Sequence, residues 1–147
     1  MIGYIDSSAL IKRYLIEAGS ETLAQFLQSA PLLMTSSLTE LEIWAAFERA
    51  KRVRRIDSPN YRRLATDFSR EMAAGFIALV PINPSIHSMA IRAIRQRRLR
   101  APDAVQLATA LSFQGTSGTQ VEFICADRAL LEAARLEGIR CHDVSSE

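Results

Sequence analysis

Four acidic residues stand where a predicted strand ends or a predicted helix begins: Asp6, Glu42, Asp103 and Asp127. Carboxylates that share one place repel each other unless a cation lies between them. The natural counter-charge for an all-oxygen site is a hard divalent ion, Mg²⁺ or Mn²⁺. Such an ion activates a bound water and holds a phosphate group. If the four side chains converge, the chemistry they predict is hydrolysis at phosphorus.

Convergence depends on the order of the elements. Short apolar runs alternate with longer helical patterns, which is typical of βαβ units around a parallel sheet. The predicted strands cover Ile2–Ile5, Leu32–Thr35, Phe76–Val80, Phe123–Cys125 and an edge strand, Ile139–His142. The fold class is therefore α/β, a three-layer α/β/α sandwich with a central parallel sheet of four to five strands. In such sheets the strand ends and the following helix starts share one edge, where ligands bind.

The helical segments lie between these strands. They are predicted after Asp6, over Glu21–Gln28, from Ser36 or Ser37, from Ser58 to about Ala74, from Asn83, from Pro102 through Phe113, and from Asp127 through Glu137. The segment Gln114–Gln120 is rich in Gly, Thr and Ser, which predicts a loop. Serine and proline at several helix starts are ordinary capping and first-turn residues.

Each acidic residue also has a purely structural explanation. An Asp at a helix start accepts a free backbone N–H and suits the positive end of the helix dipole. Near the third helix, Glu40 and Glu42 each fit a capping box. Only the set of four, taken together, favours a metal site over helix capping.

Composition narrows the class of protein. The 147 residues suit a single domain, 1–147, and 48% of them are hydrophobic. No segment approaches the about 18–20 apolar residues of a membrane span, and no signal peptide is evident, so we expect a cytoplasmic protein. The two cysteines do not form a disulfide framework, and the two histidines lack the spacing of a zinc site. No nucleophile–base pair is evident either.

Four sequence blocks resemble those of PIN domains. They read YIDSSALIKRY, SSLTELEIWAAFER, LRAPDAVQLATAL and FICADRALLEAARLEGI, in the family's order and over nearly the whole chain. The resemblance is greatest to the VapC-like toxins of type II toxin–antitoxin systems. It implies an endoribonuclease that depends on Mg²⁺ or Mn²⁺, an RNA substrate and inhibition by a cognate VapB-like antitoxin. It also implies a homodimer, or a heteromer with the antitoxin.

The resemblance assigns roles to particular residues. Asp6 and Asp103 match the family's metal-binding aspartates, and Asp127 matches the fourth acidic position. Glu42 matches the motif glutamate, because the residues behind it fall in the family's register, which leaves Glu40 as a capping or exposed carboxylate. All four are thus candidate catalytic and metal-binding residues.

Two polar positions accompany this site. Ser7 matches the polar position beside the first aspartate. Cys125 departs from the pattern, because the family has Thr or Ser there. A thiol is a weak donor, so its help in orienting a carboxylate or a water is reduced.

Arginine dominates the basic residues. The stretch 92–100 holds five Arg and no acid, and Arg97, Arg98 and Arg100 immediately precede Asp103. These three are candidate contacts to RNA phosphates. The alternative is a solvated helix face, which is what charge runs usually form.

Other functions fit the sequence less well. Within the family, a non-toxin RNA-processing nuclease and a non-catalytic module that binds RNA or protein stay open. A receiver-type phosphoacceptor needs an acidic pair after the first strand and a Lys near the fifth, and the only lysines are Lys12 and Lys51. A Walker-type NTPase is excluded because the chain has no GxxxxGK[ST] loop.

Overall fold

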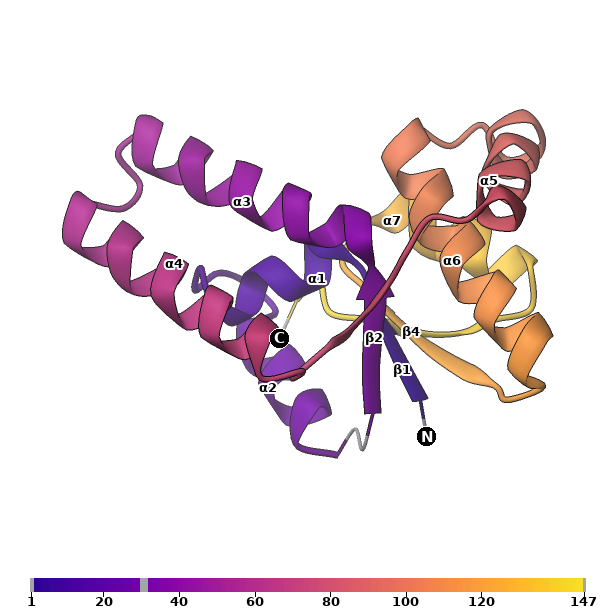
Figure 1. The fold of residues 1–147 in the computed structure, drawn as a ribbon, viewed down its shortest axis with the longest axis horizontal. Coiled ribbons are helices and arrows are strands. Elements are labelled where there is room, and N and C mark those ends of the chain that lie inside the picture. The colour runs from indigo at the N-terminus through magenta and orange to yellow at the C-terminus, as the bar shows by residue number, and fades with distance from the viewer. Residues whose placement is uncertain (1, 30–31, 147) are drawn as a thin grey trace.

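A parallel sheet of five strands runs through the centre of the molecule (Figure 1). The computed structural model describes residues 2–29 and 32–146. Its strands lie in the order β3-β2-β1-β4-β5, and every neighbouring pair is parallel. Their bounds are β1 Ile2–Ile5, β2 Leu32–Ser36, β3 Ala78–Val80, β4 Val121–Cys125 and β5 Arg140–Asp143. The predicted parallel α/β fold and the fifth strand at the sheet edge are confirmed.

Helices cover both faces of this sheet. They are α1 Ser7–Leu10 with the 3-10 turn η1 Ile11–Arg13, α2 Ser20–Ser29, α3 Ser37–Arg52, α4 Ser58–Ala73, α5 Pro84–Arg97, α6 Ala101–Ser117 and α7 Arg128–Leu136. Helices α3 and α4 form a long hairpin on one side of the view in Figure 1, and α5, α6 and α7 pack on the other side.

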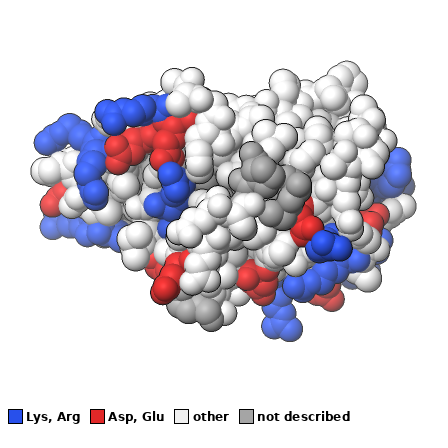
Figure 2. All heavy atoms as spheres, turned by 90° about the horizontal axis from the view of Figure 1, so that it is seen from below, with Lys and Arg blue, Asp and Glu red and all other residues white. Residues whose placement is uncertain are grey.

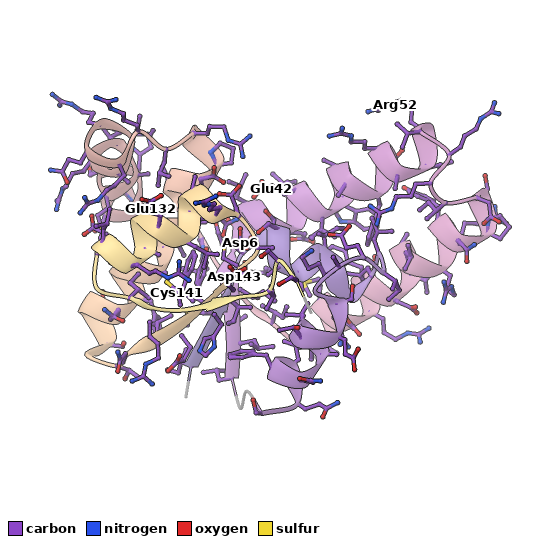
Figure 3. All side chains as sticks on the ribbon, turned by 180° about the vertical axis from the view of Figure 1, so that it is seen from behind. Asp6, Glu42, Arg52, Glu132, Cys141 and Asp143 are labelled. Carbon is purple, nitrogen blue, oxygen red and sulfur yellow. The ribbon has the colours of Figure 1, made fainter. Side chains whose placement is uncertain are left out.

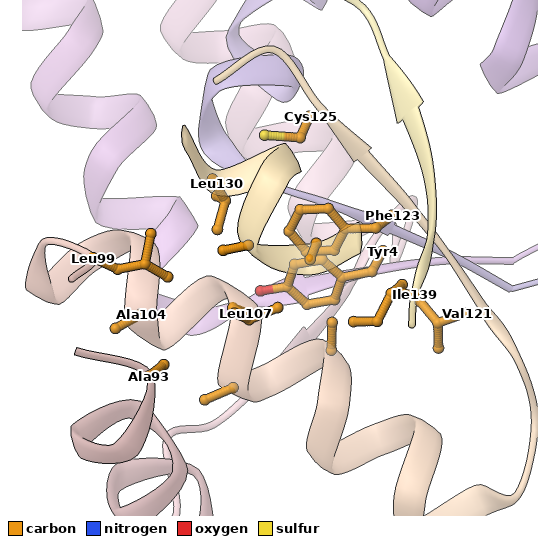
Figure 4. Close-up of a cluster of buried hydrophobic side chains, with 14 of the residues drawn as sticks. Tyr4, Ala93, Leu99, Ala104, Leu107, Val121, Phe123, Cys125, Leu130 and Ile139 are labelled. Carbon is orange, nitrogen blue, oxygen red and sulfur yellow. The ribbon is translucent and has the colours of Figure 1, made fainter. Parts of the chain in front are cut away.

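Alternation along the strands divides the buried side chains between two cores. Tyr4 and Phe123 face α5, α6 and α7, and their rings stack with centroids 5.4 Å apart (Figure 4). The next residue of each strand, Ile5 and Ile124, faces the opposite core with α1, α3 and α4. Strands buried on both faces are what a three-layer sandwich requires. The predicted α/β/α layering is thus confirmed.

Three local predictions differ from the structure. Helix α6 runs to Ser117, through much of the predicted loop, and ends where Gly118 takes the left-handed conformation, with φ +67°. The N-cap of α3 is Ser36, whose hydroxyl accepts from Leu38 N–H, so neither predicted capping box forms there. Strand β3 is shorter than predicted and begins at Ala78.

The parallel order brings three strand-to-helix junctions to one edge of the sheet. Strands β1, β2 and β4 all end there, and α1, α3 and α7 start there. Seen instead from the edge where the strands begin, Lys and Arg gather toward the two ends of the molecule (Figure 2). In the part of the chain that the structure describes, no helix is long and apolar enough to cross a membrane.

Candidate metal centre

A pocket of about 240 Å³ opens at the edge where the strands end. Asp6 and Glu42, labelled in Figure 3, lie on its wall. It is lined by Asp6, Ser7, Ser8, Ile11, Glu42, Ile43, Ala46, Arg100, Asp103 and Asp127. The four predicted acidic residues therefore converge, although they come from different elements, and Glu40 is not among the lining residues.

Asp6 is the most deeply buried of these carboxylates, with 2% of its surface exposed. It is the N-cap of α1 and accepts from Ala9 N–H at 3.2 Å. Ser8 Oγ lies 2.8 Å from Asp6 Oδ1 and donates to the carboxylate. Burial raises the pKa of Asp6 from 3.8 to about 7, against the hydrogen bonds, which lower it. No Lys or Arg among the described residues forms an ion pair with this carboxylate.

Asp103 lies in the first turn of α6 and has Arg100 as a basic partner. Arg100 Nε lies 3.2 Å from Asp103 Oδ2, and the Arg100 side chain is 78% exposed. Burial raises the pKa of Asp103, Arg100 opposes that rise, and the nearby charge of Asp127 adds to it. Asp103 and Asp127 are thus close enough to repel each other.

Glu42 and Asp127 are held by neutral donors. Glu42 Oε1 accepts from Gln106 Nε2 at 2.9 Å. Asp127 caps α7 and accepts from Leu130 N–H at 2.9 Å. Neither carboxylate has an ion-pair partner among the residues that the structure describes.

Cys125 lies behind the pocket, between Asp127 and Ser8. Its sulfur accepts from Asp127 N–H at 3.2 Å and lies 3.7 Å from Ser8 Oγ. Ser8 Oγ in turn accepts from Ala126 N–H at 3.0 Å. Burial raises the pKa of the Cys125 thiol. The sulfur is therefore a neutral acceptor that fixes the loop after β4.

The donor set fits a hard divalent cation in its chemistry. The polar side chains that line the pocket offer carboxylate and hydroxyl oxygens, apart from the Arg100 guanidinium. Among the described residues, three of the four carboxylates have no basic partner, and one of these, Asp6, is almost wholly buried. The pocket therefore concentrates negative charge that a cation would compensate. Among the described residues, however, no three His, Cys, Asp or Glu side chains lie close enough together to hold one ion as they stand.

The predicted serine and arginine residues of the site lie in two different hollows. Ser7 and Arg100 line the pocket, whereas Arg97 and Arg98 line another hollow, with Leu99, Glu132 and Leu136. Arg97 forms an ion pair with Glu137 at 2.9 Å.

Sequence reasoning missed two polar residues. Ser8, not Ser7, forms the hydrogen bond to Asp6. Gln106 contacts Glu42, and its signal was a lone amide on an otherwise apolar part of α6.

With this geometry in place, comparison with known proteins identifies the class. Residues 3–136 match the family model described as the PIN domain. That match covers most of the chain, so the protein belongs to the PIN domain family. A search of curated proteins finds no match.

Solved structures share the fold at low sequence identity. A toxin-antitoxin complex from Klebsiella pneumoniae matches with a TM-score of 0.58 and 21% identity, over 85% of this chain and 86% of that one. PAE2754 from Pyrobaculum aerophilum matches with a TM-score of 0.58 and 19% identity, over 95% and 83%. VapBC2 from Rickettsia felis, bound to a DNA fragment from its promoter, matches with a TM-score of 0.65 and 9% identity, over 97% and 98%. At these identities the likeness concerns the fold.

Proposed function

We propose that this PIN domain is an endoribonuclease that depends on Mg²⁺ or Mn²⁺ and serves as the toxin of a toxin–antitoxin pair. The observation that carries the proposal is the pocket that Asp6, Glu42, Asp103 and Asp127 line, three of them without a basic partner among the described residues. A divalent ion held by these carboxylates would supply an activated water and charge stabilisation at a scissile phosphodiester.

The chain's own residues have distinct parts in this proposal. Asp6 would be the central ligand, because Ser8 and Ala9 N–H hold its carboxylate at the end of β1. Asp103, Glu42 and Asp127 would complete the acidic wall. Arg100 is exposed beside Asp103, so its guanidinium would be placed to bind an RNA phosphate at this pocket.

RNA cleavage by the purified protein tests this proposal. We expect cleavage with Mg²⁺ or Mn²⁺ and none with EDTA, and we expect Asp6→Asn and Asp103→Asn each to abolish it without unfolding the protein. The matched control is Asp57→Asn, because Asp57 also caps a helix, α4, but does not line the pocket. Cleavage that persists in EDTA, or in both pocket variants, would refute the mechanism.

The toxin part of the proposal rests on different support. Fold relatives include a toxin-antitoxin complex and a VapBC2 complex. We expect induced expression to stop bacterial growth, and expression of Asp103→Asn to leave it unchanged. We expect a short neighbouring reading frame to encode a DNA-binding antitoxin. Expressing that antitoxin together with this protein should restore growth. Growth unaffected by an active nuclease would instead favour a processing enzyme.

A homodimer is part of the same proposal. Helix α5 carries Ile91 and Ile94 with 46% and 38% of their surfaces exposed, and such apolar side chains suit a contact between subunits. Light scattering on the purified protein, alone and with its antitoxin, measures the assembly. A monomer at all concentrations would refute the dimer.

A further inference from the structure

Four buried polar side chains form a network beneath the pocket. Tyr4, Thr35, Thr39 and Gln106 come from β1, β2, α3 and α6, and each is at most 1% exposed. Burying polar groups costs free energy unless they are hydrogen-bonded. In the part of the chain that the structure describes, no buried side-chain N or O atom lacks a partner. An apolar set could fill the same space without that requirement, so the network calls for a reason beyond packing.

The Tyr4 hydroxyl sets the orientation of the Gln106 amide. The hydroxyl accepts from Ser36 N–H at 3.1 Å, and its oxygen lies 2.6 Å from Gln106 Oε1. Figure 4 shows the hydroxyl directed from the core toward α6, near Leu107. Since the phenol has one proton and an amide oxygen can only accept, Tyr4 donates to Gln106 Oε1. The NH₂ group of Gln106 must therefore face the other way.

Both protons of this NH₂ group have acceptors. Gln106 Nε2 lies 2.9 Å from Thr39 Oγ1 and 2.9 Å from Glu42 Oε1. The second of these bonds goes to a carboxylate, which makes it stronger than a bond between neutral groups. Gln106 thereby fixes Oε1 of Glu42, whose side chain lines the pocket.

The network continues from Thr39 to the backbone beside Asp6. Thr35 Oγ1 lies 2.6 Å from Thr39 Oγ1 and 2.6 Å from the carbonyl oxygen of Ile5. Because the carbonyl can only accept, the single proton of Thr35 goes to Ile5, and Thr39 donates to Thr35. Ile5 directly precedes Asp6 in the chain. One chain of hydrogen bonds therefore connects the Glu42 side chain with the backbone that carries Asp6.

We propose that Gln106 is a positioning residue, which holds Glu42 in the orientation that binds the metal, with Tyr4 fixing its amide. The proposal rests on the proposed function, since it takes Glu42 as a ligand. Without the amide, the Glu42 side chain would have to be ordered by the ion itself, at a cost in side-chain entropy. Groups that orient metal ligands in this way typically contribute about 10–100-fold in metal affinity or activity.

Mn²⁺ binding to the RNA-free protein, followed by the electron paramagnetic resonance signal of free Mn²⁺, tests this role. Gln106→Met keeps the length of the side chain and removes the amide, and we expect it to weaken binding about 10-fold or more. The control is Gln114→Met, on the same helix, where the amide oxygen accepts from Val121 N–H far from the pocket. We expect the control to bind Mn²⁺ like the wild type.

A double-mutant cycle separates positioning from a general structural effect. If Gln106 acts through Glu42, Gln106→Met weakens Mn²⁺ binding in the wild type but causes no further loss in a Glu42→Gln background. Additive losses, or unchanged binding in Gln106→Met, would overturn the proposal. If Glu42→Gln alone leaves Mn²⁺ binding unchanged, Glu42 is not a ligand and the role of Gln106 is overturned. A wild type that binds no Mn²⁺ would instead refute the proposed metal site.

Tyr4→Phe keeps the test decisive if Gln106→Met does not fold. This variant retains the ring that stacks on Phe123 and removes only the hydroxyl that orients the amide. We expect weaker Mn²⁺ binding, with a smaller loss than Gln106→Met would cause, because the amide still has Thr39 as a partner. Binding equal to the wild type in folded Tyr4→Phe would overturn the role of Tyr4 and of the amide orientation.

Discussion

Replacing Asp6 by Asn should make the metal-free protein more stable at neutral pH, although it removes a proposed ligand. The carboxylate is 2% exposed and has no basic partner among the described residues, so its charge is unfavourable in the fold. Asparagine is also a good N-cap, and its amide oxygen can still accept from Ala9 N–H and Ser8 Oγ.

The magnitude follows from the pKa of Asp6. Burial raises this pKa from 3.8 to about 7. At about 1.4 kcal/mol per pH unit, ionising Asp6 in the fold costs at most about 4 kcal/mol. The NH₂ group of Asn needs a partner or water, which offsets about 1–3 kcal/mol of that gain. We therefore expect a net stabilisation of about 2 kcal/mol, or about 4–8 °C in Tm.

The pH dependence distinguishes this cause from others. A carboxyl group with a raised pKa binds its proton more tightly in the folded state, so its full contribution to stability is present below about pH 3.8. That contribution is lost as the pH rises from 3.8 to about 7. The Tm advantage of Asp6→Asn should accordingly be largest near pH 8 and reverse near pH 4, where the carboxyl group is protonated and only the cost of the Asn NH₂ group remains.

Thermal unfolding in EDTA across this pH range is the assay. Asp57→Asn serves as the control, because it makes the same change at an exposed helix cap, and we expect no comparable stabilisation. Saturating Mg²⁺ or Mn²⁺ should make the wild type more stable than Asp6→Asn, since the ion binds the folded wild type. An Asp6→Asn protein that is less stable than wild type at pH 8 in EDTA, or an advantage independent of pH, would refute the reasoning.

Three further predictions concern a charge, the core and the backbone. Arg100→Ala should raise the pKa of Asp103 further and weaken RNA binding. It should also reduce the slope of the logarithm of the binding constant against the logarithm of salt concentration by about 1, as measured by RNA titrations at several salt concentrations. Phe123→Ala removes a ring that is wholly buried and should cost about 3–5 kcal/mol in urea unfolding. Gly19→Ala should destabilise the protein far more than Gly118→Ala: both glycines have positive φ, but only at Gly19 would a Cβ lie 1.8 Å from a backbone oxygen, whereas Gly118 faces open space. An unchanged salt dependence would contradict the first prediction. A Phe123→Ala loss below about 1 kcal/mol would contradict the second. Equal losses of stability at the two glycines in urea unfolding would contradict the third.

Much of the fold follows from local patterns in the sequence. The apolar runs that form β1, β2 and β4 and the polar residues that begin the helices are local signals. They also locate Asp6 and Asp127, since a helix that follows a strand needs an N-cap where the strand ends, and both residues are such caps. A parallel sheet then brings those ends to one edge.

Tertiary structure decided which polar side chains meet. Whether Ser7 or Ser8 reaches Asp6 depends on the rotation of one short turn, and Arg97 is bound by Glu137, 40 residues along the chain. Gln106 meets Glu42 only because α6 packs beside β2, the strand that leads directly into α3. The sequence by itself thus determined the elements and the acidic residues at their ends, because backbone capping and apolar periodicity act over a few residues. Only the packed structure could decide the partners of each carboxylate, because hydrogen bonds between distant segments depend on how the helices sit on the sheet.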